Sequence, residues 1–140
     1  MIRLRPAEPG DAKALAELVT DLGYPVDGAE LWSRIEKMPH GTYQTLVAVM
    51  ENGVAGFIGL LTLPVYEHPL PIGWILALCI SPQHRREGLG TALIQEAEKY
   101  YRIQGVSDIR LHSGIHRDEA HKFYEKMGFD KSGYRFKKKL

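Results

Sequence analysis

The stretch between Ile72 and Gly90 constrains the fold of this chain more than any other part. Residues 72–80 are almost all apolar, and a strand of that kind needs cover on both faces. A short polar loop with two arginines follows, and Gly88 and Gly90 open the next helix. Glycines let a ligand approach the backbone, and the free N–H groups of a helix's first turn favour an anion. The sequence therefore predicts a buried strand that ends in an anion-binding turn of a size suited to a pyrophosphate.

Apolar periodicity and turn residues predict further elements on both sides of this strand. Before it we expect a strand at 2–5, helices at 9–22 and 27–38, and a hairpin of strands at 45–50 and 54–63. Asp27 is the expected cap of the second helix. After it we expect a helix between Gly88 and Gly105, a strand at 109–112 and a helix at 117–127. A terminal strand pair would use Phe129, Tyr134 and Phe136.

This order of elements indicates the fold class. Antiparallel strands followed by strand, helix and strand make a mixed sheet with helices on both sides, rather than a doubly wound parallel sheet. We therefore predict an α+β (mixed α/β) fold with a mostly antiparallel sheet of about six to seven strands and about four helices. With 140 residues and no visible linker or repeat, a single domain over 1–140 is expected.

Charge and cysteine content exclude several functional classes. Lys and Arg total 18 against 17 Asp and Glu, so the net charge of +1 provides no field that attracts nucleic acid or an anionic membrane. The one cysteine, Cys79, lies within the apolar run, which indicates a buried thiol and no disulfide framework or zinc cluster. No leader segment or apolar run of about 18 residues is visible, so a cytoplasmic location is expected.

Two common phosphate-binding motifs do not fit the glycine pair. A P-loop requires Gly-Lys followed by Ser or Thr, and the chain contains no such triplet. A dinucleotide-binding fingerprint requires a third glycine where Leu93 stands. What remains is an arginine-led motif, Arg85-x-x-Gly88-x-Gly90.

This motif resembles the coenzyme-binding turn of the GCN5-related N-acetyltransferase (GNAT) family. A second block at the expected distance, from Ala120 through Phe123-Tyr124 to Gly128-Phe129, is similar to the family's C-terminal helix signature. The resemblance extends over essentially the whole chain. The tail from Ala120 to Phe136 also resembles the aminoalkylphosphonate N-acetyltransferase branch.

The resemblance implies transfer of the acetyl group of acetyl-coenzyme A (acetyl-CoA) to a primary amine by direct attack in a ternary complex. The acceptor is expected to be a small molecule rather than a protein. No metal is implied, and family members that pair through their C-terminal strands imply a homodimer. The position-by-position correspondence assigns the pantetheine arm to the backbone of Leu78 and Ile80. It assigns the pyrophosphate to the side chains of Arg85 and Arg86 and to the amides of Arg86, Gly88, Leu89, Gly90 and Thr91.

Tyr124 matches the family's tyrosine beside the thioester sulfur. Attack by a neutral amine expels a thiolate, and a phenol with a pKa of about 10 can give it a proton, so Tyr124 is the expected general acid. Many relatives carry a glutamate on the strand before the turn, but residues 74–80 contain no acid, and Trp74 stands at one such position. The base therefore stays open between water and four side chains: Glu67, His68, His112 and His116.

The acceptor site of the family is usually walled by the first two helices and the loop before the central strand. The residues that this implies are aromatic or acidic: Tyr24, Pro25, Trp32, Tyr66, Trp74, Asp21, Asp27 and Glu30. Two other classes stay open on the sequence. The missing glutamate is compatible with a catalytically weak acyl-CoA-binding or regulatory domain, and the glycine turn with a nucleotide-binding domain.

Overall fold

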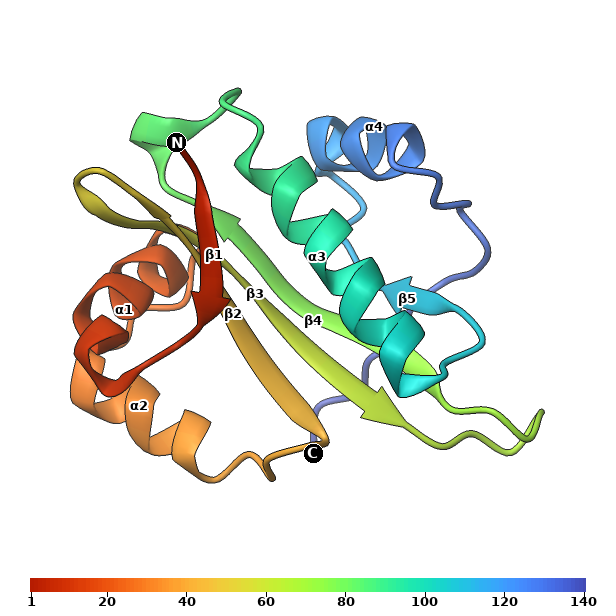
Figure 1. The fold of residues 1–140 in the computed structure, drawn as a ribbon. Coiled ribbons are helices and arrows are strands. Elements are labelled where there is room, and N and C mark those ends of the chain that lie inside the picture. The colour runs from red at the N-terminus through yellow and green to blue at the C-terminus, as the bar shows by residue number, and fades with distance from the viewer. The chain divides into compact units, whose positions relative to one another are not determined.

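Five strands form one sheet whose spatial order follows the chain, β1-β2-β3-β4-β5 (Figure 1). They are β1 (Arg3–Pro6), β2 (Tyr43–Met50), β3 (Gly53–Leu63), β4 (Ile72–Ile80) and β5 (Ile109–Leu111). The helices are α1 (Ala12–Asp21), α2 (Gly28–Glu36), α3 (Leu89–Gln104) and α4 (Asp118–Lys126), with short 3₁₀ turns at Pro9–Asp11 and Pro82–His84. The β1–β2, β2–β3 and β3–β4 pairs are all antiparallel. The predicted α+β class, with a mostly antiparallel sheet and four helices, is confirmed.

The computed structural model describes all residues from 1 to 140, and the chain divides into two compact units between Arg110 and Leu111. The first unit, Met1–Arg110, contains β1 to β4 and the helices α1 to α3. The second unit, Leu111–Leu140, contains α4. No helix in either unit has the length and apolar character needed to cross a membrane.

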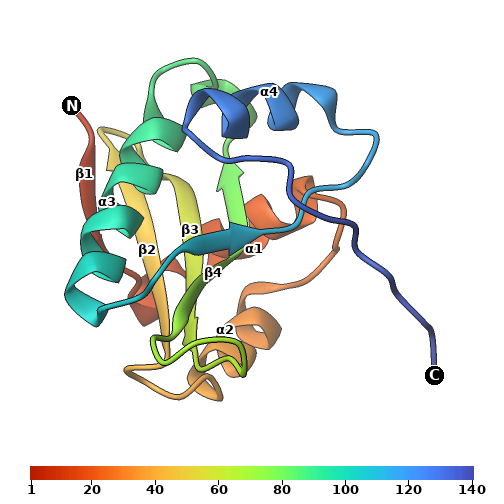
Figure 2. The same cartoon turned by 90° about the vertical axis from the view of Figure 1, so that its right-hand side faces the viewer.

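Helices cover both faces of the sheet in the first unit (Figure 2). On one face, Leu15 and Leu18 of α1 pack against Val47, Phe57 and Cys79 of the strands, and α2 adds partly buried side chains to this cluster. On the other face lies α3, whose inward positions are fully buried: Leu89, Leu93, Ile94, Ala97 and Tyr101. Each large apolar side chain removed from water in this way contributes about 1.5–3 kcal/mol, so the two layers hold the sheet between them.

Local signals determine where the helices of the first unit begin. The Asp27 side chain accepts a hydrogen bond of 2.8 Å from the Glu30 amide, which confirms it as the cap of α2. At the start of α1, Asp11 is the one buried charged residue, and Arg5 of β1 holds it with two hydrogen bonds of 2.8 and 3.0 Å. These hydrogen bonds from Arg5 lower the pKa of the Asp11 carboxyl from its ordinary value. The pair therefore ties the first strand to the first helix.

The predicted terminal strand pair is wrong, and the sheet has five strands instead of six to seven. Residues 127–140 form neither helix nor strand, and the rings of Tyr134 and Phe136 are 88% and 92% exposed. Ordering a segment as a strand costs conformational entropy, and only strand pairing and the burial of apolar side chains offset that cost. The rings of Tyr134 and Phe136 bury almost no surface. Gly133 and the run of lysines from Lys137 further disfavour an ordered hairpin.

Candidate functional site

The turn between β4 and α3 has the backbone geometry of an anion-binding site. Gly88 occupies the N-cap position of α3, and its backbone is in the left-handed region with φ of 84°. Because glycine has no side chain, it cannot accept a hydrogen bond from the first helix amides. The first helical hydrogen bond runs from the Ala92 amide to the Gly88 carbonyl, at 3.0 Å. The amides of Leu89, Gly90 and Thr91 therefore have no acceptor within the helix, at the positive end of its dipole. A Cβ added at Gly88 would have no atom within 4 Å, so the space beside this cap is open.

The loop before Gly88 contains features that sequence reasoning missed. Arg86 is the one non-glycine residue with a positive φ, 66°, and backbone of this kind is strained for a side chain of its size. His84 Nδ1 lies 2.7 Å from the Glu87 carboxylate, and the Ser81 hydroxyl hydrogen-bonds the Gln83 side chain. The three-residue spacing of His84 and Glu87 was the one signal of this pairing in the sequence. These contacts join side chains of the loop to one another.

The side chains of Arg85 and Arg86 are exposed, and neither forms an ion pair with a carboxylate of the chain. The turn thus combines uncapped amides with two guanidinium groups. Below it, Leu89 and Leu93 are 1% and 0% exposed, so the helix that presents the amides is anchored in the core.

The backbone of β4 supports the roles predicted for Leu78 and Ile80. The Ser81 amide donates to the Ala55 carbonyl of β3 at 2.7 Å, which orients Ser81 toward β3. Because backbone groups alternate along an antiparallel strand, those of Leu78 and Ile80 point to the edge away from β3. The neighbour of β4 on that side is the three-residue strand β5, and an extended ligand arm can pair in the manner of an added strand with β4 backbone groups that β5 leaves unpaired.

Tyr124, the predicted general acid, lies on α4 in the second unit. Its ring is half-buried and meets those of Phe123 and Phe129 edge to face, with centroid distances of 5.5 and 5.9 Å. The Phe129 amide closes the end of α4 by donating to the Tyr124 carbonyl at 3.0 Å. The Tyr124 ring therefore belongs to a small aromatic cluster at the end of this helix.

Two of the four candidate bases belong to a polar network of the first unit. Glu67 lies 3.8 Å from Arg110, and His68 Nε2 lies 2.8 Å from the Ser107 hydroxyl. Ser107 in turn donates to Asp108, whose pKa is lowered by its hydrogen bond from Arg110. This network links the β3–β4 loop to the segment before β5. The other two candidates, His112 and His116, are exposed in the second unit.

The residues expected to wall an acceptor site are not brought together as one group. Tyr24 and Tyr66 are 67% and 107% exposed, and Trp32 packs against the α1 side of the core. Glu30 is engaged by Arg34 at 2.6 Å. Two of the acids, Asp21 and Asp27, do line a common pocket.

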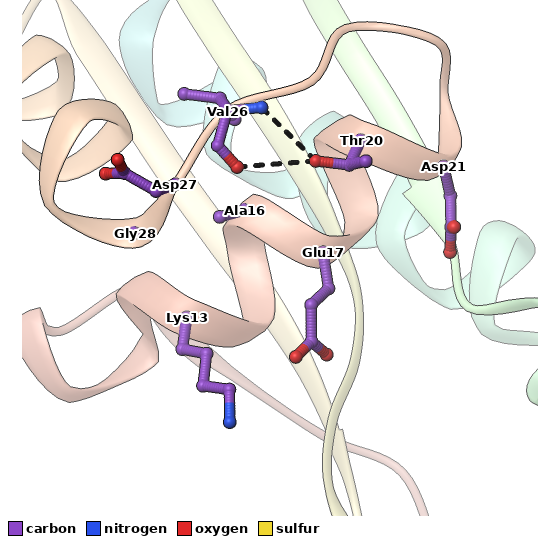
Figure 3. Close-up of a pocket in the computed structure, with 8 residues that line it drawn as sticks. All are labelled: Lys13, Ala16, Glu17, Thr20, Asp21, Val26, Asp27 and Gly28. Atoms are coloured by element: carbon purple, nitrogen blue, oxygen red, sulfur yellow. Dashed lines mark hydrogen bonds between the residues drawn. The ribbon is translucent and has the colours of Figure 1, made fainter.

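This pocket lies between α1 and the start of α2 and has a volume of about 370 Å³ (Figure 3). Glu17 and Lys13 also line it. The Thr20 hydroxyl joins its two walls through hydrogen bonds of 3.3 Å to the Val26 amide and carbonyl. Its charged side chains are exposed, and no group of three or more His, Cys, Asp or Glu side chains in the structure is arranged to hold a metal ion.

The sequence profile of the Acetyltransferase (GNAT) family matches residues 12–129, which include the glycine turn and α4. The chain belongs to this family. The resemblance found in its two sequence blocks is therefore confirmed.

Curated relatives of this GNAT chain are N-acetyltransferases. The chain is 30% identical over 129 residues to the uncharacterized N-acetyltransferase YhdJ of Bacillus subtilis, covering 89% of the chain and 85% of YhdJ. It is 33% identical over 94 residues to the aminoalkylphosphonate N-acetyltransferase of Salmonella typhimurium, covering 67% of the chain and 61% of that enzyme. The match to mouse N-acetyltransferase family 8 member 3 is 39% identical but spans only 27% of that longer protein.

Solved structures show the same fold over the full length of the chain. An acetyltransferase of Trypanosoma brucei has a TM-score of 0.85 and 26% identity, covering 100% of both chains. A GNAT family acetyltransferase of Staphylococcus aureus has a TM-score of 0.83 and 28% identity, covering 99% of this chain and 98% of its own. The fold is therefore that of a GNAT acetyltransferase.

Proposed function

We propose that this GNAT protein transfers the acetyl group of acetyl-CoA to the primary amine of a small molecule, by direct attack in a ternary complex. The observation that carries the proposal is the uncapped first turn of α3 behind Gly88, which offers backbone donors to a pyrophosphate. Three further points stay predictions: a single catalytic domain over residues 1–140, a cytoplasmic location and a homodimer.

In this proposal the coenzyme lies along the C-terminal part of β4, on the side away from β3, and ends at the glycine turn. Its pantetheine arm pairs with the backbone of Leu78 and Ile80, whose groups point away from β3. Its pyrophosphate accepts hydrogen bonds from a set of backbone amides, those of Arg86, Gly88, Leu89, Gly90 and Thr91. Arg85 and Arg86 add charge-assisted contacts, because a guanidinium binds phosphate oxygens with two parallel donors.

The chemical step needs a neutral amine and a proton for the leaving sulfur. The nitrogen lone pair forms the new C–N bond at the acetyl carbonyl, and collapse of the intermediate breaks the C–S bond. The thiolate takes a proton from the hydroxyl of Tyr124, the proposed general acid. The surplus proton of the nitrogen passes to water, and water returns one to the phenolate. With no acid on residues 74–80, this proton leaves through water, directly or by way of one of the four candidate bases, in place of the strand carboxylate of many relatives.

The first experiment is a thermal shift with acetyl-CoA, CoA and ATP. A ligand at a hundred times its dissociation constant adds about 2.7 kcal/mol to the folded state. We expect stabilisation by both coenzyme forms and none by ATP. Stabilisation by ATP alone would overturn the proposal in favour of a nucleotide-binding domain. Coenzyme binding without turnover of any amine would support the catalytically weak acyl-CoA-binding domain.

A matched pair of glycine variants tests the position of the coenzyme. Gly88 and Gly41 have φ of 84° and 89°, and an added Cβ meets nothing within 4 Å at either position. Alanine in the left-handed region costs about 1–2 kcal/mol, so Gly88→Ala and Gly41→Ala are expected to lower stability alike. Only Gly88→Ala places a methyl group in the proposed pyrophosphate space, so only it is expected to lose the shift with CoA. Equal shifts in the two variants would refute this position.

A further inference from the structure

An apolar cavity of about 160 Å³ lies in the first unit between α1, α2 and the sheet. Leu15 of α1, Ile35 of α2 and Phe57 of β3 are among the side chains that line it. None of its lining residues is Asp, Glu, Lys, Arg or His, and the polar ones are three consecutive residues of β2, Tyr43 to Thr45. A cavity of about 150 Å³ with aliphatic and aromatic walls holds one benzene molecule in another protein, so this volume suits a phenyl-sized group.

An irregularity of β4 forms one wall of this cavity. The pairing of β3 with β4 shifts between Gly59 and Leu60, which oppose Ala77 and Ile75, so Leu76 has no partner in the register. This bulge makes Leu76 and Ala77 both line the cavity, and it leaves the Leu76 side chain 48% exposed, the highest exposure on its strand. Bulges re-aim side chains and are over-represented beside active sites.

The cavity and the proposed coenzyme site lie on the same strand. Leu76 comes two residues before Leu78, where the backbone begins the edge assigned to the pantetheine arm. Two residues of strand span about 7 Å, so a group bound against Leu76 lies close to the reacting end of that arm.

We propose that the acceptor is a primary amine that carries a phenyl-sized apolar group, and that this group binds in the cavity of Leu15, Ile35, Phe57, Gly59 and Leu76. The inference rests on the proposed acetyl transfer and names the substrate class. A phosphonate or carboxylate in this space would lose its hydration without gaining a charged partner. An amine at the mouth of an apolar cavity is also partly desolvated, which lowers its pKa and favours the neutral form that attacks. That effect assists a site whose strand has no carboxylate base.

Gly59 allows the cavity to be reduced without a clash. A Cβ added there would lie 3.8 Å from the Leu76 Cβ and 3.9 Å from the Ala77 amide nitrogen, both ordinary contact distances. Gly10 is a matched control, because its added Cβ meets nothing within 4 Å and it does not line the cavity. Gly59→Ala is therefore expected to fold, and a thermal shift with CoA checks that its coenzyme site is intact.

The experiment measures kcat/KM for phenethylamine, ethylamine and aminoethylphosphonate in the wild type, Gly59→Ala and Gly10→Ala. We expect phenethylamine to be the preferred acceptor, and Gly59→Ala to lower its kcat/KM about tenfold or more while that for ethylamine stays unchanged. Gly10→Ala is expected to match the wild type. A preference for aminoethylphosphonate, or an equal loss for all three amines, would overturn the inference.

Two further readouts separate this inference from the proposed function. Binding of phenethylamine, followed by ligand-observed NMR, needs no turnover and is expected to weaken in Gly59→Ala alone. If CoA binds and amines are acetylated but Gly59→Ala leaves the affinity for phenethylamine unchanged, the cavity inference is refuted while the proposed acetyltransferase function is supported. If Gly59→Ala instead impairs only longer acyl donors, such as butyryl-CoA, the cavity holds the acyl chain and the inference is overturned.

Discussion

Removal of one buried hydroxyl, by Tyr101→Phe, tests how β3 and β4 are held together beside the bulge. The Tyr101 hydroxyl on α3 accepts a hydrogen bond from the Leu61 amide at 3.1 Å and donates one to the Trp74 carbonyl at 2.8 Å. Leu61 and Trp74 face each other in the strand register, next to the shift at Leu60. The ring itself is 1% exposed and packs where a Cβ on Gly73 would come within 2.6 Å of it. Phenylalanine keeps this packing and removes only the bridge, meaning the two hydrogen bonds by which the Tyr101 hydroxyl joins Leu61 to Trp74.

The expected cost follows from the groups that lose a partner. Leaving a buried backbone group without a hydrogen bond costs about 1–3 kcal/mol, and no cavity forms because the ring stays. For a chain of this length each kcal/mol lowers Tm by about 2–4 °C, so a decrease of about 2–12 °C is expected. Urea unfolding is expected to show a lower midpoint with an unchanged m-value. A loss below about 0.5 kcal/mol, the range of an ordinary surface change, would refute the bridge.

Alkaline pH gives the same prediction a second readout. Burial raises the pKa of Tyr101 above its ordinary value. A group whose pKa is raised on folding contributes its stability below the unfolded pKa of about 10, and that contribution is lost as pH rises above it. The unfolding free energy of the wild type is therefore expected to fall above about pH 10 more steeply than that of Tyr101→Phe. Parallel pH profiles would contradict a buried phenol at this position.

Two further predictions concern the general acid and the N-terminal ion pair. Tyr124→Phe is expected to lower kcat about 100-fold while CoA affinity stays unchanged, with the exposed Tyr134→Phe as control, and wild-type turnover would remove the acid role. Asp11→Asn weakens the charge-assisted bonds from Arg5 and is expected to cost about 1.5–3 kcal/mol in urea unfolding at neutral pH. Because folding lowers the Asp11 pKa, this contribution is present above about pH 4 and lost as pH falls below it, so the two proteins should converge in acid. A constant difference at all pH values would contradict the ion pair.

Much of the fold could be predicted because its signals are local. Pro71 and Ser81-Pro82 bound the apolar run, so the ends of β4 agree with the sequence expectation. Asp27 caps α2 for the same reason, since its side chain competes for an amide only three residues away. The glycine turn was also predictable, because the apolar strand, the polar loop and Gly88 follow one another in the sequence. No contact with a distant residue is needed to form a helix start without a side-chain cap there.

The errors and omissions come from interactions between distant residues. The alternation of Tyr134 and Phe136 is typical of a strand, but a strand also needs a pairing edge, which no local pattern reveals. The Tyr101 hydroxyl bonds Leu61 across forty positions of sequence, and nothing near Tyr101 indicates it. The bulge at Leu76 lies within a run that is apolar throughout, so no change of polarity marks the extra residue.

That extra residue explains how β4 packs against helices on both faces of the sheet and also directs backbone groups toward the proposed coenzyme. Gly73 and Cys79 are six positions apart and would lie on the same face of a regular strand. Instead Gly73 packs against Tyr101 of α3, and Cys79 packs against the α1 side of the core. The backbone direction reverses as well: the Gly73 amide donates to Asp108, away from β3, while the Ser81 amide donates to β3. One residue inserted between them thus accounts for the apolar cavity and for the outward backbone groups of Leu78 and Ile80, which together make the proposed site.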